Sequence, residues 1–212
     1  MTDETVDPNV PEQLLADAGF DLAERRTETL FRAGGVRIDG VTRRYEDDRS
    51  RTAVREATDG AIDHPIRFVA VTRLDFRPGL PPGLTVSAFA STLRSEARRS
   101  FRQRLEDRGL TGVQRGSSRR LRLAGRSRVR VREYSARDPL PEGDGRSLAL
   151  TFRLSVLTYR DTALIVTAGF PVFPVAEQFT LTDPPATLTR DHDEHEKTFE
   201  EILGAVHERL RD

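Results

Sequence analysis

The segment RSLALTFRLSVLTYRDTALIVTAGF, residues 146–170, decides the class of fold. Apolar residues occupy alternate positions, as in a strand that buries one complete face: Leu148, Leu150, Phe152, Leu154 and Val156. Asp161 and Thr162 then turn the chain directly into a second apolar strand. A parallel crossover needs about a dozen residues or more, so this short connection predicts two antiparallel neighbours.

Further strands are predicted upstream of this pair. The segments RRLRLAG (residues 119–125) and RSRVRVREY (126–134) alternate arginine with apolar residues, and EGDG (142–145) is a typical turn. The basic segment GVQRGSSRR (112–120) is predicted to be a loop because of its glycines and serines. Nearer the N-terminus, Gly34-Gly35 between two β-prone runs predicts a hairpin, and HPIRFVAVTRLDFRP (64–78) predicts one more strand.

Two long amphipathic helices complete the pattern. The first is predicted from residue 86, with Thr85 as N-cap, and the second from about residue 190. Their apolar stripes are Val86, Phe89, Ala90, Leu93, Ala97, Phe101 and Leu105 in the first, and Phe199, Ile202, Leu203, Val206 and Leu210 in the second. We therefore expect an α+β fold, in which an antiparallel sheet of about five to seven strands is packed by two long helices as a layered sandwich. Residues 1–12 are predicted to be a mobile acidic tail and residues 13–212 a single domain.

The composition argues against several functional classes. The 212 residues include no cysteine, which excludes disulfides, thiolate nucleophiles and cysteine-ligated zinc. No run of about 18 apolar residues predicts a membrane helix, and the start MTDETVDPNVPEQ lacks the features of a signal peptide. The chain has no G-x-S-x-G turn, P-loop or G-x-G-x-x-G fingerprint. We expect a cytoplasmic protein that is not an enzyme, needs no cofactor and does not bind membranes.

Charge is strongly segregated along the chain, although the net charge is zero. Residues 1–93 carry −4, residues 94–137 carry +11 and residues 138–212 carry −7. Lys197 is the only lysine, so the basic residues are almost all arginine. The codon usage of a GC-rich genome is the simplest explanation, yet arginine also suits bidentate contacts with carboxylates and phosphates.

The arginine-rich centre poses the main functional question. Arg126, Arg128, Arg130 and Arg132 occupy alternate positions and would leave one face of a strand. Because like charges on one face repel, we expect carboxylates from the acidic ends, or solvent, to compensate them. The alternative is a polyanion or nucleic-acid site formed by the arginines of the helix and the strand: Arg98, Arg99, Arg102, Arg128, Arg130 and Arg132. Few aromatic residues accompany these arginines, which weakens the case for single-stranded nucleic acid.

Histidine and carboxylate side chains cluster at the start of the C-terminal helix. His192, His195 and Glu196 have a spacing that can bind a divalent metal ion from one helix face. The competing interpretation is an acidic first turn, in which Asp191 caps the helix and Glu194 completes a capping box. No further strong ligand is evident, so capping is favoured and a metal-binding protein or enzyme is the least favoured function.

The succession of N-terminal strands, helix, antiparallel meander and C-terminal helix resembles the PsbP-like fold. The resemblance rests on RSLALTFRLSVLTYRDTALIVTAGFP followed by HEKTFEEILGAVHERL. Separately, VTRLDFRPGLPPGL and RSEARRSFRQRLEDRGL resemble uncharacterised proteins of haloarchaea. PsbP-like relatives mostly act as binding or assembly factors, so the resemblance implies a non-enzymatic binding or assembly domain with an unknown protein partner. No functional residue is carried over, because no motif matches residue by residue. An uncovered sheet face would also permit a homodimer.

Overall fold

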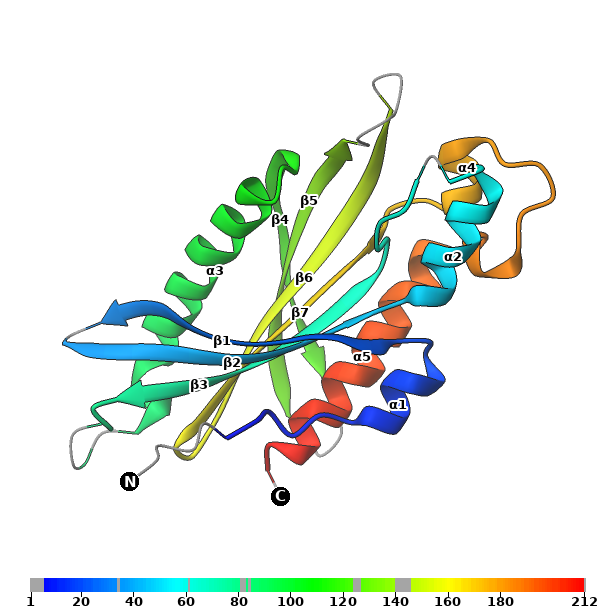
Figure 1. The fold of residues 1–212 in the computed structure, drawn as a ribbon. Coiled ribbons are helices and arrows are strands. Elements are labelled where there is room, and N and C mark those ends of the chain that lie inside the picture. The colour runs from blue at the N-terminus through cyan, green and yellow to red at the C-terminus, as the bar shows by residue number, and fades with distance from the viewer. Residues whose placement is uncertain are drawn as a thin grey trace.

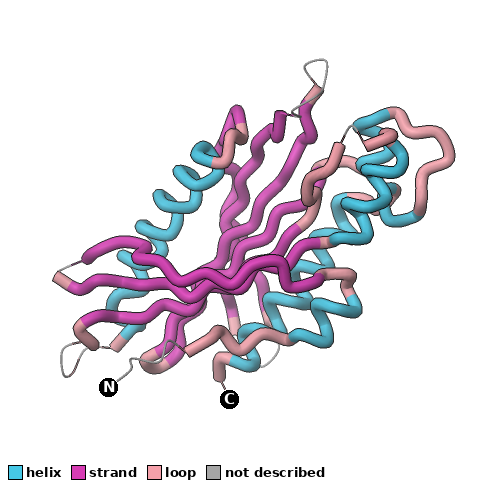
Figure 2. Tube along the Cα trace, viewed as in Figure 1, coloured by secondary structure: helices cyan, strands magenta, loops and turns pink. Residues whose placement is uncertain are grey.

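A computed structural model describes residues 6–33, 35–60, 62–80, 83, 85–123, 127–139 and 146–211. Within these residues, seven strands form one antiparallel sheet in the order β1-β2-β3-β7-β6-β5-β4 (Figures 1 and 2). The strands are β1 (Asp21–Ala33), β2 (Val36–Glu46), β3 (Phe68–Arg77), β4 (Thr111–Arg122), β5 (Arg128–Pro139), β6 (Ser147–Tyr159) and β7 (Thr162–Pro171). The predicted α+β class and the antiparallel sheet are confirmed.

The quoted segment forms the middle of this sheet. β6 and β7 are joined by the predicted tight turn, with Tyr159 opposite Thr162, and β7 also pairs with β3. This second pairing connects the N-terminal strands to the C-terminal meander. Both faces of β6 and β7 are buried, which explains why their sequences are more continuously apolar than those of the edge strands.

Helices cover both faces of the sheet. The helical elements are α1 (Glu12–Asp17), α2 (Asp48–Ala57), η1 (Val86–Phe89), α3 (Ala90–Asp107), α4 (Val175–Phe179), η3 (Ala186–Leu188) and α5 (His192–Arg209). Figure 1 shows the two long helices, α3 and α5, on opposite sides of the sheet. The capping box of Asp191 and Glu194 that the sequence predicts at the start of α5 is present.

Successive side chains of a strand point to opposite faces of the sheet, so those on one face lie toward α5 and those on the other lie toward α3. Val71 and Val166 belong to the core cluster that contains the α5 stripe, including Phe199 and Ile202. Phe152, on β6, instead contacts Phe101 of α3, with ring centroids 6.2 Å apart. Phe152 belongs to a second core cluster, on the α3 face of the sheet. Residues of α2, α4 and η3 extend this cluster at one end of β6 (Figure 1).

The structure differs from the sequence-based expectations in three places. Residues 112–120 are not a loop but most of strand β4, because an edge strand with little burial on either face has no apolar alternation to reveal it. The first helix begins as the 3-10 turn η1, and Thr85 makes no capping hydrogen bond there. In the predicted acidic tail, Val10 is buried and Asp7 pairs with Arg25 and Arg43, so residues 6–12 pack on the domain.

Candidate anion-binding site

The paired strands β4 and β5 have two electrostatically different faces. On the α5 face, Arg119 of β4 forms ion pairs with Glu196 and Glu200 of α5. Buried Arg153 of β6 lies 2.6 Å from Glu196 and 3.2 Å from Glu133 of β5. On this face, the predicted pairing of a central arginine with acidic residues of the C-terminal third is confirmed for Arg119.

On the α3 face of the same two strands, the arginines of the described residues pair with no described carboxylate. Tyr134 of β5 contacts Phe101 of α3, with ring centroids 5.4 Å apart, which places Tyr134 and the alternate positions Arg132, Arg130 and Arg128 on this face. The cross-strand neighbours of these three arginines on β4 are Ser118, Arg120 and Arg122, respectively. Within the described residues, no carboxylate forms an ion pair with Arg120, Arg122, Arg128, Arg130 or Arg132. Carboxylates of the flanks therefore do not neutralise the described part of the ladder. Arg128 and Arg130 are exposed, which agrees with the other half of the expectation, compensation by solvent; Arg126 lies outside the described residues.

Two further arginines approach this face from α3. Arg94 and Arg98 lie one helical turn apart and are half-buried, and the Arg98 Nε donates a hydrogen bond to the Arg94 carbonyl oxygen at 2.9 Å. Neither has a carboxylate partner within the described part of the chain. Their helical spacing directs both side chains to the same edge of α3.

The arginines of α3 and β5 enclose a small hollow. It has a volume of about 150 Å³, with Arg94 and Arg98 on one side, Arg130 and Arg132 on the other, and Ser91 at the end of the helix. Leu154 and Val156 of β6 also line it, and none of its lining residues in the described part of the chain is acidic. The hollow is therefore a cationic site with an apolar component, in which a bound anion would meet guanidinium groups from two separate elements.

Arg132 is the most constrained member of this group. Its Nη1 donates to the Gly116 carbonyl oxygen at 3.3 Å, whereas its Nε is buried without a hydrogen-bond partner in the described structure. Burial, together with the nearby guanidiniums of Arg115, Arg98 and Arg130, lowers the pKa of Arg132. An anion in the hollow would supply both the missing acceptor and the missing negative charge.

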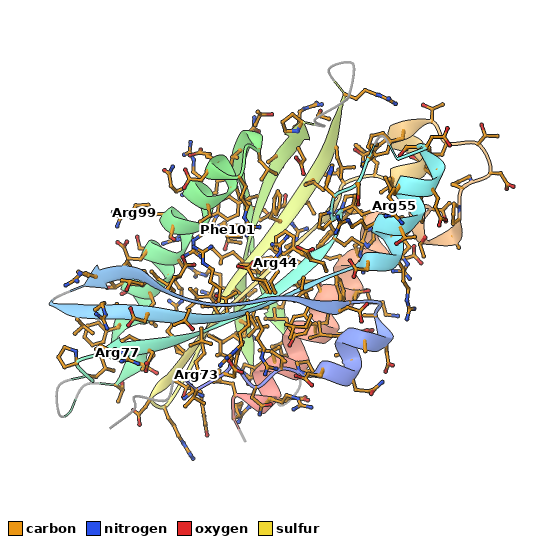
Figure 3. All side chains as sticks on the ribbon, in the orientation of Figure 1. Arg44, Arg55, Arg73, Arg77, Arg99 and Phe101 are labelled. Carbon is orange, nitrogen blue, oxygen red and sulfur yellow. The ribbon has the colours of Figure 1, made fainter. Side chains whose placement is uncertain are left out.

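Two of the predicted site residues do not belong to this group. Arg99 pairs with Glu96, and Arg102 lies 2.8 Å from Glu106, both within α3. Figure 3 shows Arg99 pointing away from the sheet, whereas Phe101 points toward it. Of the six predicted polyanion-binding residues, the structure brings Arg98, Arg130 and Arg132 around one hollow and places Arg128 on the same strand face.

Sequence reasoning missed Arg94, Arg120 and Arg122. Arg94 precedes Arg98 by one helical turn, a signal that was available from spacing alone. Arg120 and Arg122 could not be predicted as site residues, because their cross-strand partners depend on the register between β4 and β5. That register includes bulges between Thr111 and Gln114 and between Arg115 and Ser118.

A larger groove lies on the other side of α3 and has a different character. Two adjoining hollows of about 390 and 550 Å³ share Glu24, Arg44, Phe68, Leu105 and Arg108 in their linings. Arg44 stacks over the Phe68 ring, with its guanidinium carbon 3.9 Å from the centroid, and contacts Glu46 at 2.6 Å. Carboxylates line these two hollows together with the arginines, so their described lining has no excess of positive charge like that on the β5 side of α3.

The predicted metal ligands have structural partners instead. Glu196 contacts Arg153 and Arg119, and its Oε2 is 3.9 Å from the Nε2 of His192. His195 is buried against Phe170, with ring centroids 5.5 Å apart. Burial, with smaller contributions from Arg67 and Arg190, lowers the pKa of His195 to about 3. Within the described residues, no group of three or more histidine, aspartate or glutamate side chains is arranged to hold a metal ion.

The comparisons with known proteins place the chain in a family. A family model described as a domain of unknown function, DUF6517, matches residues 7–207. The chain belongs to the DUF6517 family. A comparison with curated protein sequences gave no match.

Two solved structures resemble this member of DUF6517 at low similarity. The Ran-binding protein Mog1p of Saccharomyces cerevisiae is 13% identical, with a TM-score of 0.38 over 90% of this chain and 99% of Mog1p. A variant of the protein Mog1 is 12% identical, with a TM-score of 0.36 over 86% of this chain and 95% of its own.

The described helices include none that is long and apolar enough to cross a membrane.

Proposed function

We propose that this DUF6517 domain is a non-enzymatic binding domain that holds an anionic ligand on the α3 face of β4 and β5. The observation that supports the proposal is the contrast between the two faces of these strands. Carboxylates neutralise Arg119 and Arg153 on one face, whereas the arginines on the other have none among the described residues. Within β4 alone, Arg119 pairs with α5 carboxylates, whereas its neighbour Arg120 pairs with no described carboxylate.

The uncompensated charge opposes folding, which argues for a role in binding. Directly opposed like charges in a sheet are destabilising, and Arg120–Arg130 and Arg122–Arg128 are such pairs. Here α3 adds Arg94 and Arg98 to the same hollow, which increases the repulsion in the absence of a ligand.

The proposed ligand is a polyanion that is held mainly through its charged groups. The aromatic side chains near the site, Phe101 and Tyr134, contact each other in the core, and Tyr134 is buried. They cannot serve as stacking platforms for bases. Binding would therefore be governed by charge and by bidentate guanidinium contacts, and it would weaken strongly as salt increases.

The test is the affinity for long-chain polyphosphate, measured by fluorescence anisotropy over a range of salt concentrations. The variant Arg130→Gln/Arg132→Gln should bind more weakly, and its logarithmic salt dependence should be shallower by about one to two, because each lost phosphate contact reduces the slope by about one. The matched control is Arg99→Gln/Arg102→Gln, which removes the same charge from arginines that are already paired.

The control should retain most of the affinity of the unmodified protein. Equal weakening by both double variants would show that only net charge matters and would contradict a defined site. No binding by the unmodified protein at low salt would overturn the proposed function itself.

A further inference from the structure

The hollow between α3 and β5 has properties that define its ligand more closely than charge alone. This inference rests on the proposed function and names the chemical group that the site takes. Arg94 and Arg98 of α3 and Arg130 and Arg132 of β5 line the space, so four arginines from two elements contribute to it. Each guanidinium is a planar fork that pairs best with two oxygen atoms of one anion.

The number of donors exceeds what a single carboxylate can accept. A carboxylate has two oxygens and one negative charge, so it would pair in this bidentate manner with one guanidinium and leave most of the positive charge uncompensated. Orthophosphate brings more oxygens but carries at most about two negative charges near neutral pH. A diphosphate group, with two linked phosphates and about three negative charges, offers oxygens on both sides and matches the two opposed pairs of arginines.

The size of the hollow also favours a compact anion. Its volume of about 150 Å³ is below the roughly 300 Å³ at which ordinary small-molecule pockets begin, so a complete nucleotide would not fit inside. Leu154 and Val156 form an apolar boundary of the hollow. An apolar boundary lowers the local dielectric constant and so strengthens charge interactions beside it. Ser91 adds a neutral hydroxyl at the helical end.

We propose that this hollow is a diphosphate-binding site, in which Arg94 and Arg98 hold one phosphate and Arg130 and Arg132 hold the other. The buried Nε of Arg132 has no hydrogen-bond partner in the described structure, so an added acceptor would satisfy it. The rest of the ligand lies outside the hollow. The diphosphate group can therefore come from free pyrophosphate, from the end of a polyphosphate chain or from a nucleoside diphosphate.

The test is isothermal titration calorimetry of the full chain at constant ionic strength with pyrophosphate, orthophosphate and citrate. We expect one pyrophosphate per chain, bound at least about tenfold more tightly than orthophosphate or citrate. Citrate carries a similar charge on carboxylates, so equal affinity for citrate and pyrophosphate would overturn the assignment to diphosphate. The variant Arg94→Gln/Arg98→Gln should lose about tenfold or more in pyrophosphate affinity, whereas Arg99→Gln/Arg102→Gln should retain it.

Two further titrations identify the source of the diphosphate group. Tripolyphosphate that binds more tightly than pyrophosphate would support a polyphosphate chain, and ADP that does so would support a nucleoside diphosphate. Circular dichroism of each variant checks that it is folded. If pyrophosphate does not bind, but long-chain polyphosphate still binds in a manner that depends on Arg130 and Arg132, the diphosphate assignment fails and the proposed function stands. If neither binds, both fail.

Discussion

Removing one charge from the arginine face should make the protein more stable. In the variant Arg130→Gln, the cross-strand repulsion with Arg120 is lost, which is worth about 0.2–1 kcal/mol. Arg128 and Arg132 lie two positions away on the same strand, at a spacing of about 6.7 Å. Coulomb's law in water, screened by about 0.1 M salt, gives about 0.3 kcal/mol for each of these two neighbours. The free energy of unfolding should therefore rise by about 1 kcal/mol.

This gain can be measured by thermal unfolding in the absence of phosphate. For a domain of this size, about 1 kcal/mol corresponds to an increase of about 2–4 °C in the melting temperature. At about 1 M sodium chloride the screening length falls to about 3 Å, so most of the gain should disappear. The control Arg99→Gln breaks the ion pair with Glu96 and should lower the stability slightly, by about 0.3 kcal/mol.

Either of two results would refute this reasoning. A loss of stability in Arg130→Gln would mean that the arginine has a favourable partner in the folded state. A gain of the same size in low and high salt would mean that the effect comes from strand propensity or solvation and not from repulsion between guanidiniums.

Three other predictions concern the compensated face and the core. Arg153→Met should lower the free energy of unfolding by about 1–3 kcal/mol in urea titrations, because Glu196 loses its buried arginine partner and keeps only Arg119 among the described arginines. His195 has an ordinary pKa of 6.5 and a folded pKa of about 3, so between these values the unfolded chain binds the additional proton and stability falls as the pH drops. His195→Leu should reduce that slope by up to about 1.4 kcal/mol per pH unit between about pH 6.5 and 5, and an unchanged slope would contradict the assignment. Gly169→Ala should cost about 1–3 kcal/mol by the same urea assay, because the added methyl group would collide with the Phe68 ring.

The sequence predicted a strand or helix correctly where burial of one face gives its apolar residues a regular spacing. The alternation in β6 identified the central strand, and the capping residues Asp191 and Glu194 identified the start of α5. β4 was missed over residues 112–120 because it is exposed on both sides and contains bulges, so turn-forming residues dominate its pattern. Local rules detect elements that bury one face, and they detect exposed edge strands poorly.

The candidate site was only partly predictable for a related reason. Strand alternation correctly put Arg128, Arg130 and Arg132 on one face, but it could not show which helix lies over that face. Arg119 and Arg120 are neighbours in sequence, yet one is paired with α5 carboxylates and the other is not. Charge segregation along the chain indicated that acids and arginines would meet, and only the tertiary arrangement determined which arginines they meet. The PsbP-like assignment and the protein partner stay predictions.

The most direct measurement is NMR of the arginine side-chain Nε–H groups during a titration with pyrophosphate. Signals of Arg94, Arg98, Arg130 and Arg132, assigned through single glutamine variants, should shift together and saturate at one equivalent. Signals of Arg119 and Arg153 should stay in place, because carboxylates already occupy them. Uniform small shifts across all exposed arginines, or shifts on the α5 face instead, would contradict the account.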